Sequence, residues 1–466
     1  MLSLMGVTIL GLVPQMSRAQ SLDPLSPTPM GPPATETLIR PTAPAAPSSV
    51  SPALPALPGF GATPDQPVPV VQAPVKKKKI IKPAAPRETV LSDDPTPTLQ
   101  PETFFATAKA SERYSTIVDA GGWPQVSGGL KAGATGKAVA ILRQRLAIEG
   151  DLAPEMVNDG EKWTPELSAA IKHFQSRYGL RQTAVVSGAT LREMNVPANV
   201  RFKQLASSAQ RLAGLHFAFG DRYVVVNLPS ASVEAVENGA VVHRYVAVVG
   251  DVEHRSPEET ARITAVNLNP TWTLPTSIIK NEIIPKMRAN PNYLARAHIR
   301  ILNGRNEEVD PRQVNWNSER ATLFTLRQDS GTGNSLGSIR IQMPNKDAVY
   351  MHDTPAKALF ANDYRFASHG CVRVQGVYDF AQWLLEGTIN PTSGTWDVPA
   401  MKAVVATQER MDVRLQKAVP VAWVYLTGWA NGDGSVQFRP DVYGLDSVNV
   451  GAPIEAAPAD PNITKL

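Results

Sequence analysis

The chain has a single cysteine, Cys371, and its neighbours include groups that can activate a thiol. His369 and Gly370 precede it directly, and a second histidine, His352, stands earlier in the same region. The thiolate is the nucleophilic form of cysteine, and a base or cation lowers the thiol pKa from its ordinary value of about 8.5. A lone cysteine is otherwise often a small buried apolar residue, but the His-Gly-Cys context favours a catalytic thiol.

Length and composition exclude several classes of protein. With 466 residues the chain can form two or more domains, and about half of its 41 prolines fall between Asp23 and Pro101. One cysteine excludes an internal disulfide and CxxC metal sites, and HExxH, GxxxxGK[ST] and GxSxG motifs are absent from the sequence. We therefore expect neither a metal nor a cofactor. The net charge of +4, without an arginine-rich stripe, gives no indication of nucleic-acid binding.

The first residues have the pattern of an export signal. An apolar run over residues 1–13 is too short to span a bilayer, and Ser17-Arg18-Ala19 provides small residues for cleavage after Ala19. No basic residue precedes the run, unlike in most signal peptides. We expect residues 1–19 to be a signal peptide. In an exported protein an unpaired cysteine indicates a free reactive thiol.

The next segment and the end of the chain are predicted to be irregular. Residues 20–104 are rich in Pro, Ala and Ser and are expected to form a disordered tether. Four lysines, Lys76–Lys79, form a basic run that could give weak contact with an anionic membrane surface or polymer, or could simply be solvated. Residues 447–466 are predicted to be an irregular tail.

A small helical domain is predicted over residues 123–197. Residues 136–148 have apolar side chains at helical spacing. Thr164 is a suitable N-cap, Pro165 suits the first helical turn, and Gly179 can end that helix. A third short helix is expected over residues 189–194. The pattern predicts a three-helix arrangement.

A β-rich domain is predicted from Arg222 onward, where the apolar period changes to two. Asn238-Gly239 is a two-residue hairpin signal between two of these strands. The strand pattern lapses into helical and loop sequence between residues 278 and 327. The remaining predicted elements are strands at 223–228, 232–237, 240–249 and 338–342, helices at 377–385 and 399–415, and a closing hairpin of 421–426 with 435–438.

The motifs resemble known families. His352 followed by Ser368-His369-Gly370-Cys371-Val372-Arg373 is similar to the signature of L,D-transpeptidases of the YkuD family. Further segments are similar to its YcbB-like periplasmic subgroup, namely 269–272, 334–337, 343–345, 352–355 and 436–443. The helical region resembles the peptidoglycan-binding domain 1 family through Arg143-Gln144-Arg145-Leu146, Ile171-Lys172-His173-Phe174-Gln175 and Gly188-Ala189-Thr190-Leu191.

The resemblance implies a mixed fold class. We expect a small three-helix peptidoglycan-binding-like domain followed by a β-rich YkuD-type catalytic domain over residues 222–446, with a capping subdomain inserted at 276–327. It also implies a reaction in which the cysteine thiolate attacks a tetrapeptide stem of peptidoglycan and expels the terminal D-Ala. The thioester then passes to the amine of an acceptor stem, which gives a 3→3 crosslink.

The resemblance also assigns roles to residues. Cys371 is the expected nucleophile and His352 the general base and acid, which predicts an imidazolium–thiolate pair. Backbone amides near Gly370 could form an oxyanion hole, with His369 and Ser368 in support. Arg373 could bind a substrate carboxylate or hold its own loop. A backbone carbonyl is expected to orient His352 in preference to the Asp353 carboxylate, and Trp272 is expected in the core.

Two alternatives stay open at this point. Water instead of an amine could attack the thioester, which would make the protein an L,D-carboxypeptidase that trims tetrapeptide stems. A catalytic domain without activity would make it a cell-wall anchor, although the intact Cys371 and His352 disfavour this. The expected partners are peptidoglycan stem peptides, as donor tetrapeptide and acceptor amine, and the expected location is the periplasm or cell envelope.

Overall fold

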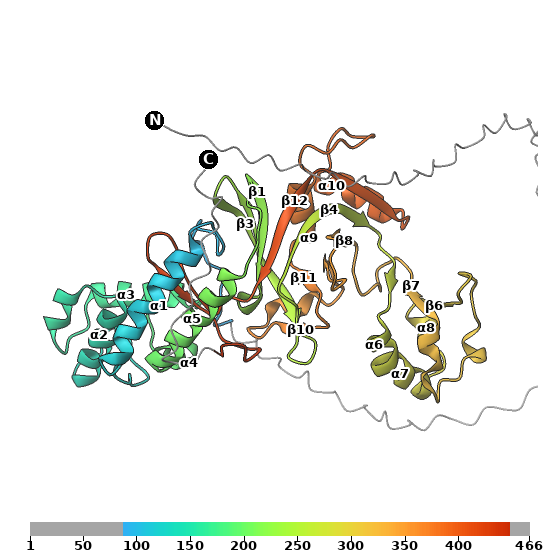
Figure 1. The fold of residues 1–466 in the computed structure, drawn as a ribbon. Coiled ribbons are helices and arrows are strands. Elements are labelled where there is room, and N and C mark those ends of the chain that lie inside the picture. Colours follow the sequence, from blue (N-terminus) through green and yellow to red (C-terminus); the bar gives the residue numbers. More distant parts are fainter. Residues whose placement is uncertain (1–86, 448–466) are drawn as a thin grey trace, which may run out of the picture. The chain divides into compact units, whose positions relative to one another are not determined.

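The computed structural model describes residues 87–447 and contains a helical region, a large β-sheet and a smaller inserted region (Figure 1). The predicted signal peptide, most of the predicted tether, Lys76–Lys79 and nearly all of the predicted tail lie outside the described residues. Within residues 87–447, every helix is too short or too polar to cross a bilayer.

Five helices form the helical region: α1 (Thr103–Asp119), α2 (Lys137–Glu149), α3 (Pro165–Arg177), α4 (Gly188–Met194) and α5 (Ala198–Ala213). The three predicted helices are present as α2, α3 and α4. Helix α1 was not predicted, because the side chains that it buries are mostly small or polar: Thr103, Thr107, Ala110, Ser111 and Tyr114. Helix α3 begins as predicted, since the Thr164 hydroxyl accepts a hydrogen bond from the Leu167 amide.

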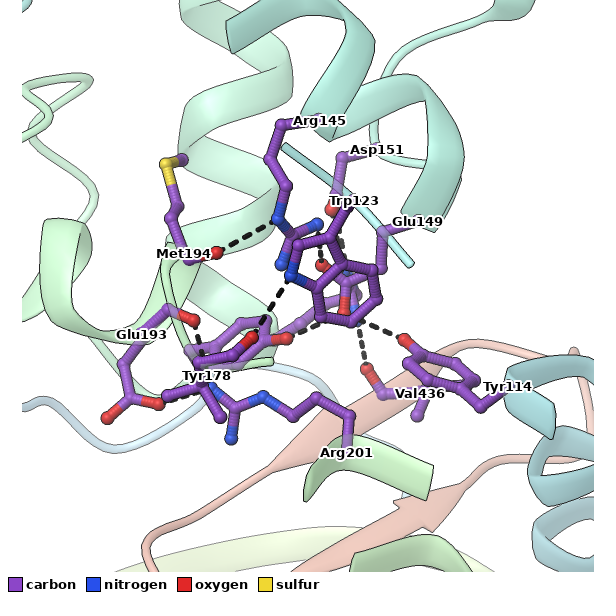
Figure 2. Close-up of polar contacts among 12 residues, drawn as sticks. Tyr114, Trp123, Arg145, Glu149, Asp151, Tyr178, Glu193, Met194, Arg201 and Val436 are labelled. Carbon is purple, nitrogen blue, oxygen red and sulfur yellow. Dashed lines mark hydrogen bonds and ion pairs between the residues drawn. The ribbon is translucent and has the colours of Figure 1, made fainter. Parts of the chain in front are cut away.

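The helical region contains a buried network of ion pairs (Figure 2). Arg145 pairs with Glu149 at 2.7 Å, and Arg177 pairs with Asp151 at 2.6 Å. The hydroxyls of Tyr114 and Tyr178 donate to the Glu149 carboxylate at 2.7 and 2.6 Å. Burial disfavours the charged form of Glu149, but the two arginines outweigh it and hold its pKa well below the usual range. The buried charges are therefore matched.

A hairpin near the end of the chain completes the helical core. It consists of β13 (Gly428–Ala430) and β14 (Val436–Phe438). Arg177 donates to the Val436 carbonyl at 2.6 Å, and the Phe438 ring stacks on Tyr178. The predicted pairing of 421–426 with 435–438 is wrong, because residues 421–424 pair with other strands.

Nine strands form the large sheet, in the order β10-β3-β11-β9-β8-β4-β12-β1-β2. Because β2 also pairs with β3, the sheet closes on itself as a barrel. Strands β2 (Ser232–Glu237) and β3 (Ala240–Gly250) match the prediction closely, because the two-residue turn Asn238-Gly239 between them fixes their register. The strands are β1 (Arg222–Asn227), β2 (Ser232–Glu237), β3 (Ala240–Gly250), β4 (Glu259–Leu268), β8 (Ile339–Gln342), β9 (Met351–His352), β10 (Phe366–Ser368), β11 (Val372–Val374) and β12 (Met411–Val424).

The predicted helix over residues 399–415 is only half correct. Helix α10 covers Val398–Ala406, and β12 begins at Met411. Val413 and Leu415 are buried at a period of two, and β12 pairs with β4, which overrides the apolar spacing that suggested a longer helix. The other helix that follows the cysteine, α9 (Val377–Leu384), is as predicted.

An inserted region lies between β4 and β8 and has its own core. It contains β5 (Trp272–Thr273), α6 (Thr276–Ile278), a π-helical turn (Ile279–Ile283), α7 (Ile284–Ala289), α8 (Tyr293–Arg296), β6 (Ile299–Leu302) and β7 (Thr325–Gln328). The three strands form a separate sheet in the order β5-β7-β6. Its buried apolar side chains include Ile283, Leu294 and Leu326. No strand was predicted here, because these strands are too short to show a period.

Part of the predicted tether is ordered against the large sheet. The Thr98 amide donates to the Glu234 carboxylate at 2.8 Å, and Arg244 donates to the Asp94 carbonyl at 2.9 Å. The amides of Glu88 and Thr89 donate to the Asp363 carboxylate. Residues 87–99 therefore form a strap, although proline content predicted disorder for them.

Candidate active site

Strand register brings the candidate catalytic residues onto one face of the sheet. His352 on β9 lies opposite Arg373 on β11 and opposite Arg340 on β8. Directly opposed residues share a face, and successive residues alternate, so Tyr350 joins this face as well. The residues between them point the other way into the apolar core, among them Ile341, Met351 and Val372.

The hydroxyls of two serines, Ser368 and Ser256, hydrogen-bond the backbone of the turn that carries Cys371. Gly370 has a φ of 105°, which favours glycine. The Ser368 hydroxyl donates to the Cys371 carbonyl at 2.5 Å and accepts from the Gly370 amide at 3.3 Å. The Ser256 hydroxyl donates to the Gly370 carbonyl at 2.7 Å. Ser368 therefore fixes the turn, and the Gly370 amide is already engaged.

Cys371 and His352 line one cavity of about 430 Å³. The inserted region forms much of its wall, with Ile278, Glu282, Lys286 and Tyr293 among the residues that it contributes. From the large sheet and its loops come Tyr350, Ser368, His369 and Arg373. The structure thus gathers the predicted site residues Cys371, His352, Ser368, His369 and Arg373, while Gly370 shapes the turn beside them.

The orientation of His352 follows from its backbone contact. Its Nδ1 lies 2.5 Å from the carbonyl oxygen of Asp353, so Nδ1 donates a proton to that oxygen. The Asp353 carboxylate instead accepts from the Ser338 amide at 3.1 Å and pairs with Lys357. A backbone carbonyl thus orients the imidazole, and the tautomer leaves Nε2 as the proton acceptor.

Burial keeps the thiol and imidazole in their neutral forms. It raises the pKa of Cys371 to about 11, although Tyr350, Arg373 and Arg340 act in the opposite direction. It lowers the pKa of His352 to about 4, and the charge of Arg373 adds to this. The predicted imidazolium–thiolate pair is therefore wrong for these two groups, since burial disfavours both charges.

Tyr350 and Trp272 are site residues that the sequence reasoning missed. Both residues line the cavity with Cys371, and the Tyr350 side chain acts to lower the pKa of the thiol. Trp272 lines the cavity, although it was placed in the core. Alternation along a strand that contains His352 could have identified Tyr350, whereas Trp272 reaches the site only through the folding of the inserted region.

His369 faces the inserted region. Its Nε2 lies 2.9 Å from a Glu282 carboxylate oxygen, and its ring packs 4.7 Å from that of His254. His254, which lies outside the sequence motifs, also lines the cavity. His369 therefore links the Cys371 loop to the inserted region.

Arg373 is a half-buried cation that has no ion-pair partner within residues 87–447. Its Nε atom is buried and has no hydrogen-bond partner among the residues described. Among these residues, no carboxylate lies within ion-pair distance of its guanidinium. A free guanidinium in a cavity beside a nucleophile can bind a substrate carboxylate.

Comparison with known families agrees with this arrangement. Residues 221–399 match the family model of the YkuD "L,D-transpeptidase catalytic domain", and residues 135–194 match the "Putative peptidoglycan binding domain". The chain therefore carries a catalytic domain of the YkuD L,D-transpeptidase family, preceded by a peptidoglycan-binding 1 domain. The family match ends before β12, which completes the sheet.

One curated relative and several solved structures are similar to the chain. A "Putative L,D-transpeptidase" of Haemophilus influenzae is 31% identical over 246 residues, which is 52% of this chain and 48% of the relative. The chain thus spans about half the length of that relative. L,D-transpeptidase structures from Stackebrandtia nassauensis and Xylanimonas cellulosilytica are 13% and 16% identical, with TM-scores of 0.25 and 0.21. Each alignment covers 65% of this chain, and it covers 97% and 100% of the respective structure.

Proposed function

We propose that the protein is a cysteine-dependent L,D-transpeptidase that forms 3→3 crosslinks in peptidoglycan. The observation that carries the proposal is the shared cavity of Cys371 and His352, with the imidazole fixed through Nδ1 and a free guanidinium on Arg373. Both family matches support a peptidoglycan substrate. Because peptidoglycan lies outside the cytoplasm, we also propose a location in the periplasm or cell envelope.

The first half-reaction forms a thioester. As the Cys371 sulfur attacks the carbonyl carbon of the third stem residue, its proton passes to Nε2 of His352. Backbone amides around Cys371 stabilise the oxyanion of the tetrahedral intermediate. When the intermediate collapses, the peptide bond to the terminal D-Ala breaks, and its nitrogen takes the proton from His352. A carboxylate of the donor stem binds Arg373.

The second half-reaction transfers the acyl group to an acceptor stem. The side-chain amine of that stem attacks the thioester carbonyl and gives its proton to His352. Collapse then breaks the carbon–sulfur bond, and the proton returns to the sulfur. We assign the inserted region, including residues 276–327, the role of a cap that positions stems and excludes water, because it supplies a wall of the cavity.

Incubation of purified stem tetrapeptides with the full chain tests the proposal. Both monomeric and dimeric stems are supplied, and the products are identified by mass spectrometry. A 3→3 dimer with loss of D-Ala is expected, together with an acyl adduct on the intact protein that is missing in Cys371→Ala. A tripeptide product alone would show an L,D-carboxypeptidase. No product from any stem would favour the cell-wall anchor and overturn the proposal.

A further inference from the structure

A row of polar side chains crosses four strands of the large sheet beside Cys371. Register places Arg340 on β8 opposite His352 on one side and opposite Asn267 on β4 on the other. Asn267 in turn lies opposite Asp412 on β12. Hydrogen bonds follow the same order: Arg340 Nε donates to the Asn267 side-chain oxygen at 2.9 Å, and the Asn267 amide donates to Asp412 at 2.8 Å.

This row holds Arg340 against the group that contacts the thiol. The Arg340 guanidinium carbon lies 5.3 Å from the centroid of the Tyr350 ring, which is cation–π distance. Tyr350 lines the cavity with Cys371, its carbonyl accepts from the Val372 amide at 3.1 Å, and its side chain acts to lower the pKa of the thiol. Arg340 is therefore one aromatic ring away from the sulfur, in a half-buried position where charge is weakly screened.

The charge of Arg340 is not neutralised at close range. Its nearest fixed partner is the neutral amide of Asn267, and Asp412, which orients that amide, is itself paired with Arg410 at 2.5 Å. A carboxylate directly on Arg340 would cancel its effect on the sulfur. A neutral amide between the two charges fixes the guanidinium while leaving its positive field available to a nearby anion.

We propose that Arg340 is a positioning residue that stabilises the Cys371 thiolate from the neighbouring strand, and that Asn267 and Asp412 hold it there. This inference rests on the proposed function, because the thiolate is the state that attacks the stem. When the thiol proton passes to His352, the negative charge on sulfur gains the fields of Arg340 and Arg373 together.

Other ionisable groups line the cavity that contains Cys371 and define the background of the test. On the strands and loops of the large sheet they are His254, Asp347, Tyr350, His352, His369 and Arg373. The inserted region adds Glu282, Lys286 and Tyr293. None of these groups changes in a variant at position 340, so a difference between variants measures the contribution of that position.

Alkylation of the sole cysteine by iodoacetamide measures the thiolate directly. At a fixed pH below the thiol midpoint, the rate is proportional to the thiolate fraction. We expect Arg340→Gln in the full chain to react about three- to tenfold more slowly, which corresponds to an upward shift of about half to one pH unit. Arg340→Lys retains the charge and should recover most of the rate, which a purely structural role would not predict.

Arg262→Gln is the matched control, because Arg262 is an exposed arginine on β4 that donates to the Ala418 carbonyl, away from the row. It should react at the wild-type rate. Equal rates for wild type and a folded Arg340→Gln, or an equal slowing in Arg262→Gln, would overturn the inference. If Arg340→Gln does not fold, Asn267→Ala decides: slower alkylation supports the inference and an unchanged rate refutes it. The proposed crosslinking activity is read separately from stem products, so either proposal can fail alone.

Discussion

The helical region and the candidate active site both bury charge, but they do so in opposite ways. In the helical region Arg145 and Arg177 are paired with Glu149 and Asp151, and tyrosine hydroxyls satisfy the remaining oxygens. At the site Arg373 and Arg340 flank His352 without a carboxylate partner among the described residues.

Matched buried charges mainly specify and hold a fold, because removal of one partner leaves the other unpaired. Unmatched charges of one sign instead prepare a site for the opposite charge. At this site the anions would be the thiolate, the oxyanion and a substrate carboxylate. Burial is the main reason why the pKa of His352 is low, and Arg373 lowers it further because it disfavours a second cation. Variants in the two regions should therefore separate activity from stability.

Removal of the nucleophile should give the largest effect, and it should be confined to activity. Cys371→Ala is expected to lower turnover by several orders of magnitude, on the order of 10⁶ as for other nucleophile losses. The unfolding free energy should change little, because the thiol contributes no ion pair to the fold. Mass spectrometry of stem products measures the turnover, and urea unfolding of the same sample measures the unfolding free energy. Undiminished crosslinking by the variant would exclude Cys371 as nucleophile.

Sequence alone identified the part of this site that lies in a short motif. Cys371, His369 and Arg373 are close in sequence, so their proximity needs no knowledge of the fold. The strands β2 and β3 were also predictable, since apolar residues at a period of two flank a two-residue turn that requires positive φ.

Arg340 and Trp272 could not be placed in the same way. Arg340 reaches the site only through the pairing of β8 with β9, and that register depends on long-range contacts. Trp272 depends on the packing of the inserted region, whose strands are short. The shifted pKa of Cys371 was missed for a related reason, because a motif gives the neighbours of a thiol but not its burial.

Breaking the matched network should produce the largest loss of stability. Glu149→Gln removes the carboxylate that two arginines and two tyrosines share, and we expect a loss of about 3–5 kcal/mol in unfolding free energy. Chemical denaturation measures it. Arg192→Gln is the matched control, because its ion pair with Glu88 is largely exposed and should contribute less than about 1 kcal/mol. Equal losses in both variants would show that the buried network contributes no more to the unfolding free energy than an exposed ion pair does.

The buried His352 lowers the unfolding free energy of the protein at acidic pH. The pKa of His352 falls from 6.5 to about 4 on folding, so below pH 6.5 the unfolded chain takes up a proton that the folded chain does not. Stability from this group is complete above pH 6.5 and is lost as the pH falls toward 4. Between pH 7.5 and pH 5 the loss is about 2 kcal/mol.

His352→Gln removes this titration. The difference in unfolding free energy between wild type and His352→Gln should therefore shift by about 2 kcal/mol over the same pH interval, in the direction that disfavours wild type at pH 5. Other titrating groups cancel in the difference. A difference that stays constant from pH 7.5 to pH 5 would mean that His352 can be protonated in the folded protein, and that it is more hydrated than its buried position indicates.

The smallest effect is expected where a charge pair lies at the site but is open to solvent. His369 and Glu282 join the Cys371 loop to the inserted region, and their side chains are 41% and 32% exposed. Solvent screens such a pair, so Glu282→Gln should change the unfolding free energy by less than about 1 kcal/mol, well below the loss in Glu149→Gln. The alkylation rate of Cys371 should stay near wild type, because Glu282 contacts the imidazole of His369 and not that of His352. A destabilisation as large as that of Glu149→Gln would mean that the contact between the inserted region and the Cys371 loop stabilises the fold. The contrast between matched charges that hold the fold and unmatched charges that serve the site would then no longer hold.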